Sequence, residues 1–238
     1  MGLRSPITIT LGNDRLAAEV RGAVRRFPVA GDIVTALDRV DLEVRVAGMS
    51  VVAGPSGSGK STLLSLIGCT QRPDEGTVKI GDTDVTKISR RDRRELRRDR
   101  LGIVLPQPSE NLLDQFDAAA NVRWAAAQRR GAAHLEDVDV DELLESVGLA
   151  AASGRRVRQL SGGEQQRLAV ACALAGDPEL IILDEPTASL DRTNATSLVD
   201  VLTMVAARGS TLIIATHDPL VIDAADTVAE LDHGRRVQ

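Results

Sequence analysis

The run Gly54-Pro55-Ser56-Gly57-Ser58-Gly59-Lys60-Ser61-Thr62 combines glycines, hydroxyls and a lysine at a spacing that suits phosphate binding. It fits the pattern G-x-x-x-x-G-K-[ST], in which backbone N–H groups and the lysine bind phosphates and the hydroxyl binds Mg²⁺. The apolar runs Met49 to Ala53 and Leu63 to Ile67 predict the strand and the helix start on either side. We therefore expect this stretch to bind ATP and Mg²⁺. The alternative is a glycine-rich turn that happens to precede a lysine.

Polar side chains also follow two other predicted buried strands. Asp184 and Glu185 follow Leu180 to Leu183, and His217 follows Thr211 to Thr216. Ligands of open α/β sheets bind outside the carboxyl ends of the strands, so these side chains should face the phosphates. We expect Asp184 to hold the Mg²⁺ shell, Glu185 to orient or deprotonate water, and His217 to contact the terminal phosphate. The alternatives are a solvated acidic corner and a structural histidine. His134 and His233 have no such context, and we expect both to lie at the surface.

A second helix start contains the sequence Leu160-Ser161-Gly162-Gly163-Glu164-Gln165-Gln166-Arg167. A serine followed by two glycines at a helix N-terminus makes a second anion-binding device. One ATP molecule does not need two such devices in one subunit. The spacing alone does not separate this interpretation from an ordinary capped helix.

Composition indicates a globular domain with an aliphatic core and gives no sign of a nucleic-acid-binding or disulfide-rich protein. With 238 residues, 43% hydrophobic and 26% charged, the chain is long enough for one domain with a sizeable core. Aromatic residues make up 1%, so the core must consist of Leu, Ile, Val and Ala. A net charge of −5 gives no reason to expect nucleic-acid binding, and Cys69 and Cys172 suit a reducing compartment.

No segment predicts targeting or membrane insertion. Polar residues interrupt Met1 to Val20, so we expect no signal peptide there. No apolar run approaches the ~20 residues that a membrane helix needs. A function at a membrane would therefore require a partner that spans the bilayer.

Two segments before the second helix start have open interpretations. Leu16 to Phe27 and Val34 to Val46 predict an antiparallel ribbon. Without further context Phe27 is more readily interpreted as a core residue than as a platform for a flat base. Ser89 to Arg100 contains seven arginines, a density that would suit nucleic acid or lipid headgroups. Its interleaved acidic residues and lack of aromatics favour a solvated helix face. From about Asn111 to Gly154 the pattern predicts a helical insert.

The order of these motifs resembles the nucleotide-binding subunit of ATP-binding-cassette (ABC) transporters over nearly the whole chain. The octapeptide at 160–167 is very specific for that family, and Ser189-Leu190-Asp191 also matches. The resemblance implies an α/β fold with a RecA-like P-loop NTPase core, an antiparallel β edge subdomain and an α-helical insert. It implies one ABC ATPase domain over 1–238, with the β edge and core at about 16–106 and 168–238 and the helical subdomain at about 107–167.

The resemblance also gives the second anion device a role. It implies a head-to-tail homodimer that sandwiches two ATP molecules. Each ATP lies between the phosphate loop of one subunit and the octapeptide at 160–167 of the other, which we call the signature. The signature residues expected at the nucleotide are Ser161, Gly162, Gly163 and Glu164, together with Asp191. Phe27 lies where the family usually has an aromatic residue, which implies an adenine platform.

Within the family, the chain is similar to the lipoprotein-releasing and macrolide-efflux ATPases. The similarity depends on Gly31-Asp32, Leu66-Ile67-Gly68-Cys69, Asn111-Leu112-Leu113 and the end of the chain after Asp232-His233-Gly234-Arg235. It implies an ATPase at the cytoplasmic face of the membrane, held there by a permease with an extracytoplasmic domain, that drives export or lipoprotein or lipid extrusion. Alternatives are an ATPase of a mechanotransmission complex that controls a cell-wall enzyme, an importer ATPase, or a soluble relative acting on DNA or ribosomes.

One position departs from the family pattern. The family usually has an aromatic residue followed by glutamine at the end of the strand that starts near Leu101, but Leu105 and Pro106 occupy those places. Gln107 is one residue late. We expect the loop to shift so that Gln107 still reaches Mg²⁺; the alternative is that water and metal contacts are weaker.

Overall fold

The computed structural model describes residues 15–29, 31–130 and 138–237. The sequence-based predictions about residues 1–14 and about a surface position for His134 lie outside these ranges. His233, the other histidine predicted to lie at the surface, is exposed and pairs with Asp232 at 2.7 Å.

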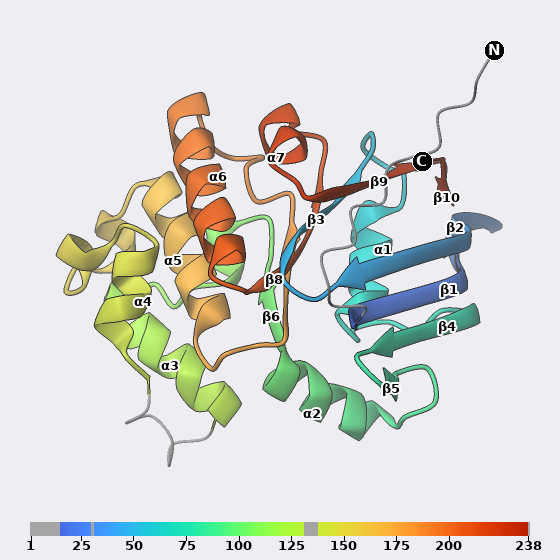
Figure 1. The fold of residues 1–238 in the computed structure, drawn as a ribbon, viewed down its shortest axis with the longest axis horizontal. Helices are drawn as coiled ribbons and strands as arrows, with labels where there is room; N and C mark the ends of the chain where they lie inside the picture. Colours follow the sequence, from blue (N-terminus) through green and yellow to red (C-terminus); the bar gives the residue numbers. More distant parts are fainter. Residues whose placement is uncertain (1–14, 30, 131–137, 238) are drawn as a thin grey trace.

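A four-stranded antiparallel sheet forms one side of the molecule, in the order β2-β1-β4-β5 (Figure 1). Its strands are β1 (Leu16–Val29), β2 (Asp32–Arg45), β4 (Glu75–Ile80) and β5 (Thr83–Asp84). β1 and β2 pair antiparallel with Phe27 opposite Val34, which confirms the predicted ribbon. The alternation of buried and exposed side chains along β2 is what a sheet with one solvated face requires.

A six-stranded sheet forms the centre of the molecule, in the order β10-β9-β3-β8-β7-β6. Its strands are β3 (Gly48–Ala53), β6 (Leu101–Val104), β7 (Leu180–Asp184), β8 (Thr211–Thr216), β9 (Thr227–Asp232) and β10 (Arg235–Arg236). All neighbours pair in parallel except β10, which runs antiparallel to β9. Every residue of β8 is buried, as the near-continuous apolar runs of parallel strands predict.

Helices cover both faces of the parallel sheet (Figure 1). They are α1 (Lys60–Ile67), α2 (Arg90–Arg100), α3 (Ala118–Arg130), α4 (Val140–Ser146), α5 (Gly162–Leu174), α6 (Arg192–Ala207) and α7 (Pro219–Asp223). α1 contacts strands of both sheets, whereas α5 and α6 pack against the other face of the parallel sheet. α3 and α4 pack on α5. The helices α3 and α4 therefore reach the sheet through α5.

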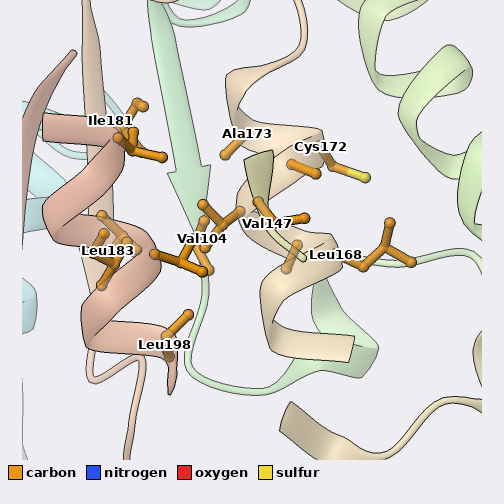
Figure 2. Close-up of a cluster of buried hydrophobic side chains, with 14 of the residues drawn as sticks. Val104, Val147, Leu168, Cys172, Ala173, Ile181, Leu183 and Leu198 are labelled. Carbon is orange, nitrogen blue, oxygen red and sulfur yellow. The ribbon is translucent and has the colours of Figure 1, made fainter. Parts of the chain in front are cut away.

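Aliphatic side chains fill the core on both sides of the parallel sheet. Figure 2 shows part of the larger cluster, in which Val104 and Leu183 of the sheet meet Leu168 of α5 and Leu198 of α6. None of the buried side chains in the described ranges is aromatic, as the composition predicts. Trp124 of α3 is 45% exposed. No helix within the described ranges has the length and apolar character to cross a bilayer.

Candidate functional site

The loop between β3 and α1 packs closely against the backbone of neighbouring strands. Gly54, Gly57 and Gly59 have φ angles of 153°, 80° and 102°, which favour glycine. A Cβ on Gly54 would lie 2.2 Å from the Leu231 carbonyl oxygen, and one on Gly59 would lie 2.4 Å from that of Ala36. The backbone conformation favours glycine at all three positions, and Gly54 and Gly59 also permit close contact with β9 and β2, respectively.

Lys60 lies inside this loop. The residue is 4% exposed, and Nζ donates hydrogen bonds to the carbonyl oxygens of Gly54 at 2.8 Å and Pro55 at 3.0 Å. The same ammonium lies 3.2 Å from Oε1 of Glu185. Ser58 is also buried, and its Oγ has no hydrogen-bond partner. Since an unpaired buried hydroxyl is costly, the loop fits a ligand with acceptor oxygens, as a phosphate has.

Ser61 and Asp184 bring two hard oxygen ligands together beside the loop. Ser61 Oγ donates to Asp184 Oδ1 at 3.0 Å. Burial raises the pKa of the Asp184 carboxyl, and the hydrogen bond from Ser61 opposes that shift. No cluster of three or more His, Cys, Asp or Glu side chains suited to a metal occurs in the described ranges. The pair fits Mg²⁺ because that ion commonly takes one or two protein oxygens and completes its shell with water and substrate phosphates.

Glu185 is held between two cationic or hydrogen-donating groups. Its two carboxylate oxygens lie 3.1 and 3.0 Å from His217 Nδ1, and one of them faces Lys60. A carboxylate oxygen can only accept here, so a hydrogen bond at this contact requires the His217 tautomer with its proton on Nδ1. Glu185 has a φ of 45°, and its backbone N–H donates to the Ala215 carbonyl oxygen at 2.8 Å. This arrangement fixes a general-base candidate at the end of β7.

The structure therefore brings most of the residues predicted to act on ATP to the carboxyl ends of neighbouring strands in the parallel sheet. Residues 54–62 follow β3, Asp184 and Glu185 end β7, and His217 follows β8, and these three strands are neighbours in the order β3-β8-β7. Crossover connections between parallel strands place β3 beside β8. This adjacency therefore cannot be predicted from any single segment of the sequence. It is the physical reason why Lys60, Glu185 and His217 meet.

Gln107 lies outside this set of contacts. It is exposed in the loop after β6, where its N–H donates to Glu110 Oε2 at 3.3 Å and its carbonyl oxygen accepts from Asn111 Nδ2 at 2.9 Å. Its predicted contact with Mg²⁺ remains a prediction.

Asn111 organises the same loop, a role that sequence reasoning missed. Its Oδ1 accepts from the Leu105 N–H at 2.8 Å, and its Nδ2 donates to the carbonyl oxygen of Leu105 at 2.9 Å as well as to that of Gln107. The side chain of Leu105 is exposed. A short amide shortly after a proline-rich strand end is the signal that could have indicated this loop anchor.

Phe27 belongs to neither of the two buried core clusters, so its interpretation as a core residue is wrong. The ring is half-buried near the end of β1, and the guanidinium carbon of Arg25 lies 4.7 Å from the ring centroid. This stacked cation stabilises the ring at the sheet edge. A half-buried ring of this kind is available as a platform for a base, and that role remains a prediction.

The signature segment forms a complete helix cap. Ser161 Oγ accepts from the Glu164 N–H at 3.3 Å, and Glu164 Oε2 accepts from the Ser161 N–H at 2.7 Å, which is a capping box. The hydrogen bond from the Ser161 backbone, with others including one from Arg155, lowers the pKa of Glu164. A Cβ on Gly163 would lie 2.2 Å from Asn194 Oδ1, so this glycine permits the close packing of α5 on α6. Gly162 is exposed with space around it.

Asp191 caps the next helix in the same way. Its Oδ1 accepts from the Asn194 N–H at 2.9 Å, and this bond lowers the pKa of Asp191. In the described ranges, the hydrogen bonds of Ser161, Glu164 and Asp191 are made around their own helix ends and none reaches residues 54–62. Within one chain the signature and the phosphate loop are thus two separate devices.

Comparison with known proteins decides the family. Residues 37–188 match the family model described as ABC transporter. The chain belongs to the ABC transporter family. The ATP-binding protein LolD of the lipoprotein-releasing system of Novosphingobium aromaticivorans is 41% identical to this ABC ATPase over 214 residues, which cover 88% of this chain and 93% of that protein. The resemblance inferred from the motifs is confirmed.

A second relative of this ABC ATPase is much longer. The macrolide export ATP-binding/permease protein MacB 1/2 of Paracoccus denitrificans is 35% identical over 218 residues, which cover 92% of this chain and 32% of that protein. The chain therefore spans about a third of the length of the macrolide exporters that it matches.

Solved structures agree with the fold class. A dimeric ATP-binding cassette in a post-hydrolysis state, bound to ADP and phosphate, matches with a TM-score of 0.81 and 30% identity, over 93% of this chain and 97% of that chain. The predicted ABC ATPase fold is confirmed. As a member of this family, the chain is an ATPase that binds and hydrolyses ATP.

Proposed function

We propose that this ABC ATPase works as a homodimer that couples ATP binding and hydrolysis to a separate membrane permease with an extracytoplasmic domain. It acts at the cytoplasmic face of the membrane and drives export or lipoprotein or lipid extrusion. The observation that carries the enzymatic part is the contact of Glu185 with both Lys60 and His217 beside the phosphate loop. The names of the LolD and MacB relatives support the transport part.

The phosphate loop binds ATP by exchanging internal contacts for contacts with phosphate. In the structure, the Lys60 ammonium is satisfied by Gly54, Pro55 and Glu185. A bound phosphate replaces these acceptors, and the unpartnered hydroxyl of Ser58 and the backbone N–H groups of residues 54–62 supply further donors. Phe27 stacks with the adenine ring at the other end of the nucleotide.

Ser61, Asp184 and Gln107 are the residues that would hold Mg²⁺. When bound, the ion neutralises charge that develops on the phosphate oxygens. Holding the ion would require the Ser61 hydroxyl to give up its hydrogen bond to Asp184, so that both oxygens could serve as ligands. Asp184 therefore stays beside Ser61 but changes the group that it faces.

Glu185 then acts on the attacking water. When Lys60 turns to phosphate, Glu185 loses its cationic partner and can accept a proton from water. His217 keeps the carboxylate in place through Nδ1 and contacts the terminal phosphate from the end of β8. Both residues act on the same phosphoryl group.

The second half of each site comes from the partner subunit. Ser161, Gly162, Gly163 and Glu164 of one chain, with Asp191, close over the nucleotide bound to the phosphate loop of the other. Their separation from the loop within one chain supports this arrangement. We propose that the segment at about 107–167 moves as a helical subdomain and transmits this closure from the core at about 16–106 and 168–238.

Affinity capture tests the transport part. Tagged chain expressed in its own host and extracted with detergent should retain an integral-membrane protein, and the captured complex should hydrolyse ATP faster than the chain alone. A matched capture with the tag alone controls for adhesion. Recovery with ribosomes or DNA and no membrane protein would show that the proposal is wrong.

A further inference from the structure

The proposed ATPase cycle uses none of the seven arginines of α2. Three of them form ion pairs that fit the predicted solvated helix face. These pairs are Arg91 with Glu95 at 2.9 Å, Arg98 with Asp99 at 2.6 Å and Arg100 with Glu179 at 2.6 Å. The other four have no carboxylate within ion-pairing distance in the described ranges; they are Arg90, Arg93, Arg94 and Arg97.

Two of these unpaired arginines lie at a surface pocket of about 320 Å³ between α2, α3 and the edge strand β6. Figure 1 shows α2 and α3 on the same side of the molecule, and the two helices are in contact. We call this the arginine pocket and define it by its polar lining: Arg94, Arg97, Arg98, Gln128 and Arg129. Leu101 and Ile103 complete it, and no acidic side chain of the described ranges lines it.

Hydrogen bonds to backbone hold two of the guanidinium groups at the pocket. Arg97 Nη1 donates to the Cys69 carbonyl oxygen at 3.2 Å, and Arg129 Nη1 donates to that of Ala173 at 2.5 Å. Burial lowers the pKa of Arg129, although a guanidinium keeps its proton in proteins. Each guanidinium carries five N–H donors. The anchors use one donor each and prevent the two like charges from moving apart into solvent.

The helix dipole does not balance this charge. Arg97 and Arg98 lie in the last turn of α2, where the helix end offers about half a negative elementary charge. Arg98 is further paired with Asp99. Arg94, Arg97 and Arg129 still leave an excess of positive charge around a concave surface, and like charges at such distances repel. An anionic ligand would convert this repulsion into attraction.

We propose that the arginine pocket binds a phosphate group, at a site separate from the ATP site. Guanidinium groups match phosphate oxygens with paired hydrogen bonds, and a pocket lining that holds several of them and no acidic side chain in the described ranges favours such an anion. The phosphate can belong to a lipid headgroup or to a soluble phosphate. Trp124 lies four residues before Gln128 and thus on the same face of α3, where its half-exposed ring suits a lipid interface.

The test uses two probes on the full chain carrying Lys60→Ala, which removes phosphate binding by the ATP site. Titration calorimetry measures binding of inorganic phosphate, and sedimentation measures binding to vesicles of phosphatidylcholine with or without phosphatidylglycerol. We expect binding to at least one probe, weaker at high salt. Phosphate binding identifies a soluble source. Binding only to phosphatidylglycerol vesicles identifies a headgroup.

A pocket variant and a matched control decide whether the arginine pocket is responsible. Arg94→Gln/Arg97→Gln should weaken binding by about tenfold, because it removes two charge-assisted donors. Arg90→Gln/Arg91→Gln makes the same charge change on the same helix outside the pocket, and should have little effect. Arg94→Gln alone, at an exposed side chain, should weaken binding by about threefold and decides the matter if the double variant unfolds. Absence of binding to both probes would overturn the proposal, and so would an equal loss of binding in the control variant. ATP hydrolysis by chains with Lys60 intact tests the proposed function separately.

Discussion

Asp184 and Glu185 are neighbours in sequence but lie in different electrostatic surroundings. Asp184 is partly buried beside Ser61, and burial raises its pKa. Glu185 faces Lys60 and His217. Adjacent residues of an extended strand point in opposite directions, but Glu185 follows the strand with a φ of 45° and so has a different orientation. This difference explains how two consecutive carboxylates can serve a metal shell and an attacking water.

Glu185→Gln should reduce ATP hydrolysis by about 10²- to 10⁴-fold, because the amide keeps the size of the side chain but cannot accept the proton of water. ATP binding should be retained, and the closed dimer should accumulate. Phosphate release and nucleotide binding are the measurements. Glu179→Gln, which alters a surface partner of Arg100, is the matched control and should hydrolyse ATP at the normal rate. Normal hydrolysis by Glu185→Gln would contradict the assigned role.

Asp184→Asn should stabilise the nucleotide-free protein at pH 7. The pKa of Asp184 in the folded state is above its ordinary value of 3.8, so the folded chain holds this proton more tightly than the unfolded chain. The raised pKa therefore stabilises the folded protein below about pH 3.8, where the carboxyl is protonated. This stabilisation is lost as the pH rises through the folded pKa, so at neutral pH the buried negative charge lowers the free energy of unfolding. Thermal unfolding should give a higher Tm for the variant at pH 7 and a smaller difference near pH 4.

A control separates this effect from a general change in charge. Asp82→Asn removes a carboxylate from an exposed position and should leave Tm almost unchanged. The variant Asp184→Asn should also lose the stabilisation that wild-type protein gains from Mg²⁺ and ATP together. A lower Tm for Asp184→Asn at pH 7 would contradict the argument from burial.

Helix α5 begins with residues that have both a structural and a proposed binding role. The capping box of Ser161 and Glu164 starts the helix, and Gly163 lets it pack closely on α6. The alternatives considered from sequence, an ordinary cap and an anion device, are therefore compatible. Substitutions that retain the cap can separate them.

Ser161→Asn and Ser161→Asp should both fold with stability within about 1 kcal/mol of the wild type, because Ser, Asn and Asp are similarly good N-caps. Their ATPase activities should differ. The aspartate places a negative charge where the partner's nucleotide carries its phosphates, so hydrolysis should fall at least about tenfold below that of the asparagine variant. Tm and steady-state hydrolysis are the measurements. Equal activity of the two variants would indicate that this helix end does not approach a nucleotide.

Regular elements and strand-end motifs were predictable because their signals are local. The apolar run before Gly54 gives β3, and Ser161 with Glu164 gives the start of α5. The core composition followed from the scarcity of aromatics. The contact of Lys60 with Glu185 was not predictable at the level of atoms, because it depends on the order of strands in the sheet. Asn111 was missed because its hydrogen bonds depend on the path of the loop after β6.

At the scale of the whole molecule, the proposed dimer makes each ATP site composite. In a two-fold symmetric dimer, the phosphate loop of each subunit meets the signature of the other. One chain therefore contains two halves that belong to different sites. This is testable by mixing two inactive variants.

Lys60→Ala should inactivate the phosphate loop, and Ser161→Asp should inactivate the signature. In a dimer that contains one subunit of each kind, one site has both defects and the other has none. Random mixing at equal concentrations should therefore restore up to about a quarter of wild-type hydrolysis, since half of the dimers are mixed and each has one intact site. Activity equal to the sum of the separate variants would contradict a composite site. Mixing each variant with itself is the control.

Trp124 has a further consequence, because the chain contains one tryptophan and no tyrosine. This residue is 45% exposed on α3. Intrinsic fluorescence of this protein therefore originates from one helix, with no tyrosine background. An emission change on adding ATP would report an event at α3 without any attached dye. Conversely, a fluorescence melting curve would follow the surroundings of that helix and should be compared with circular dichroism before it is taken as global unfolding.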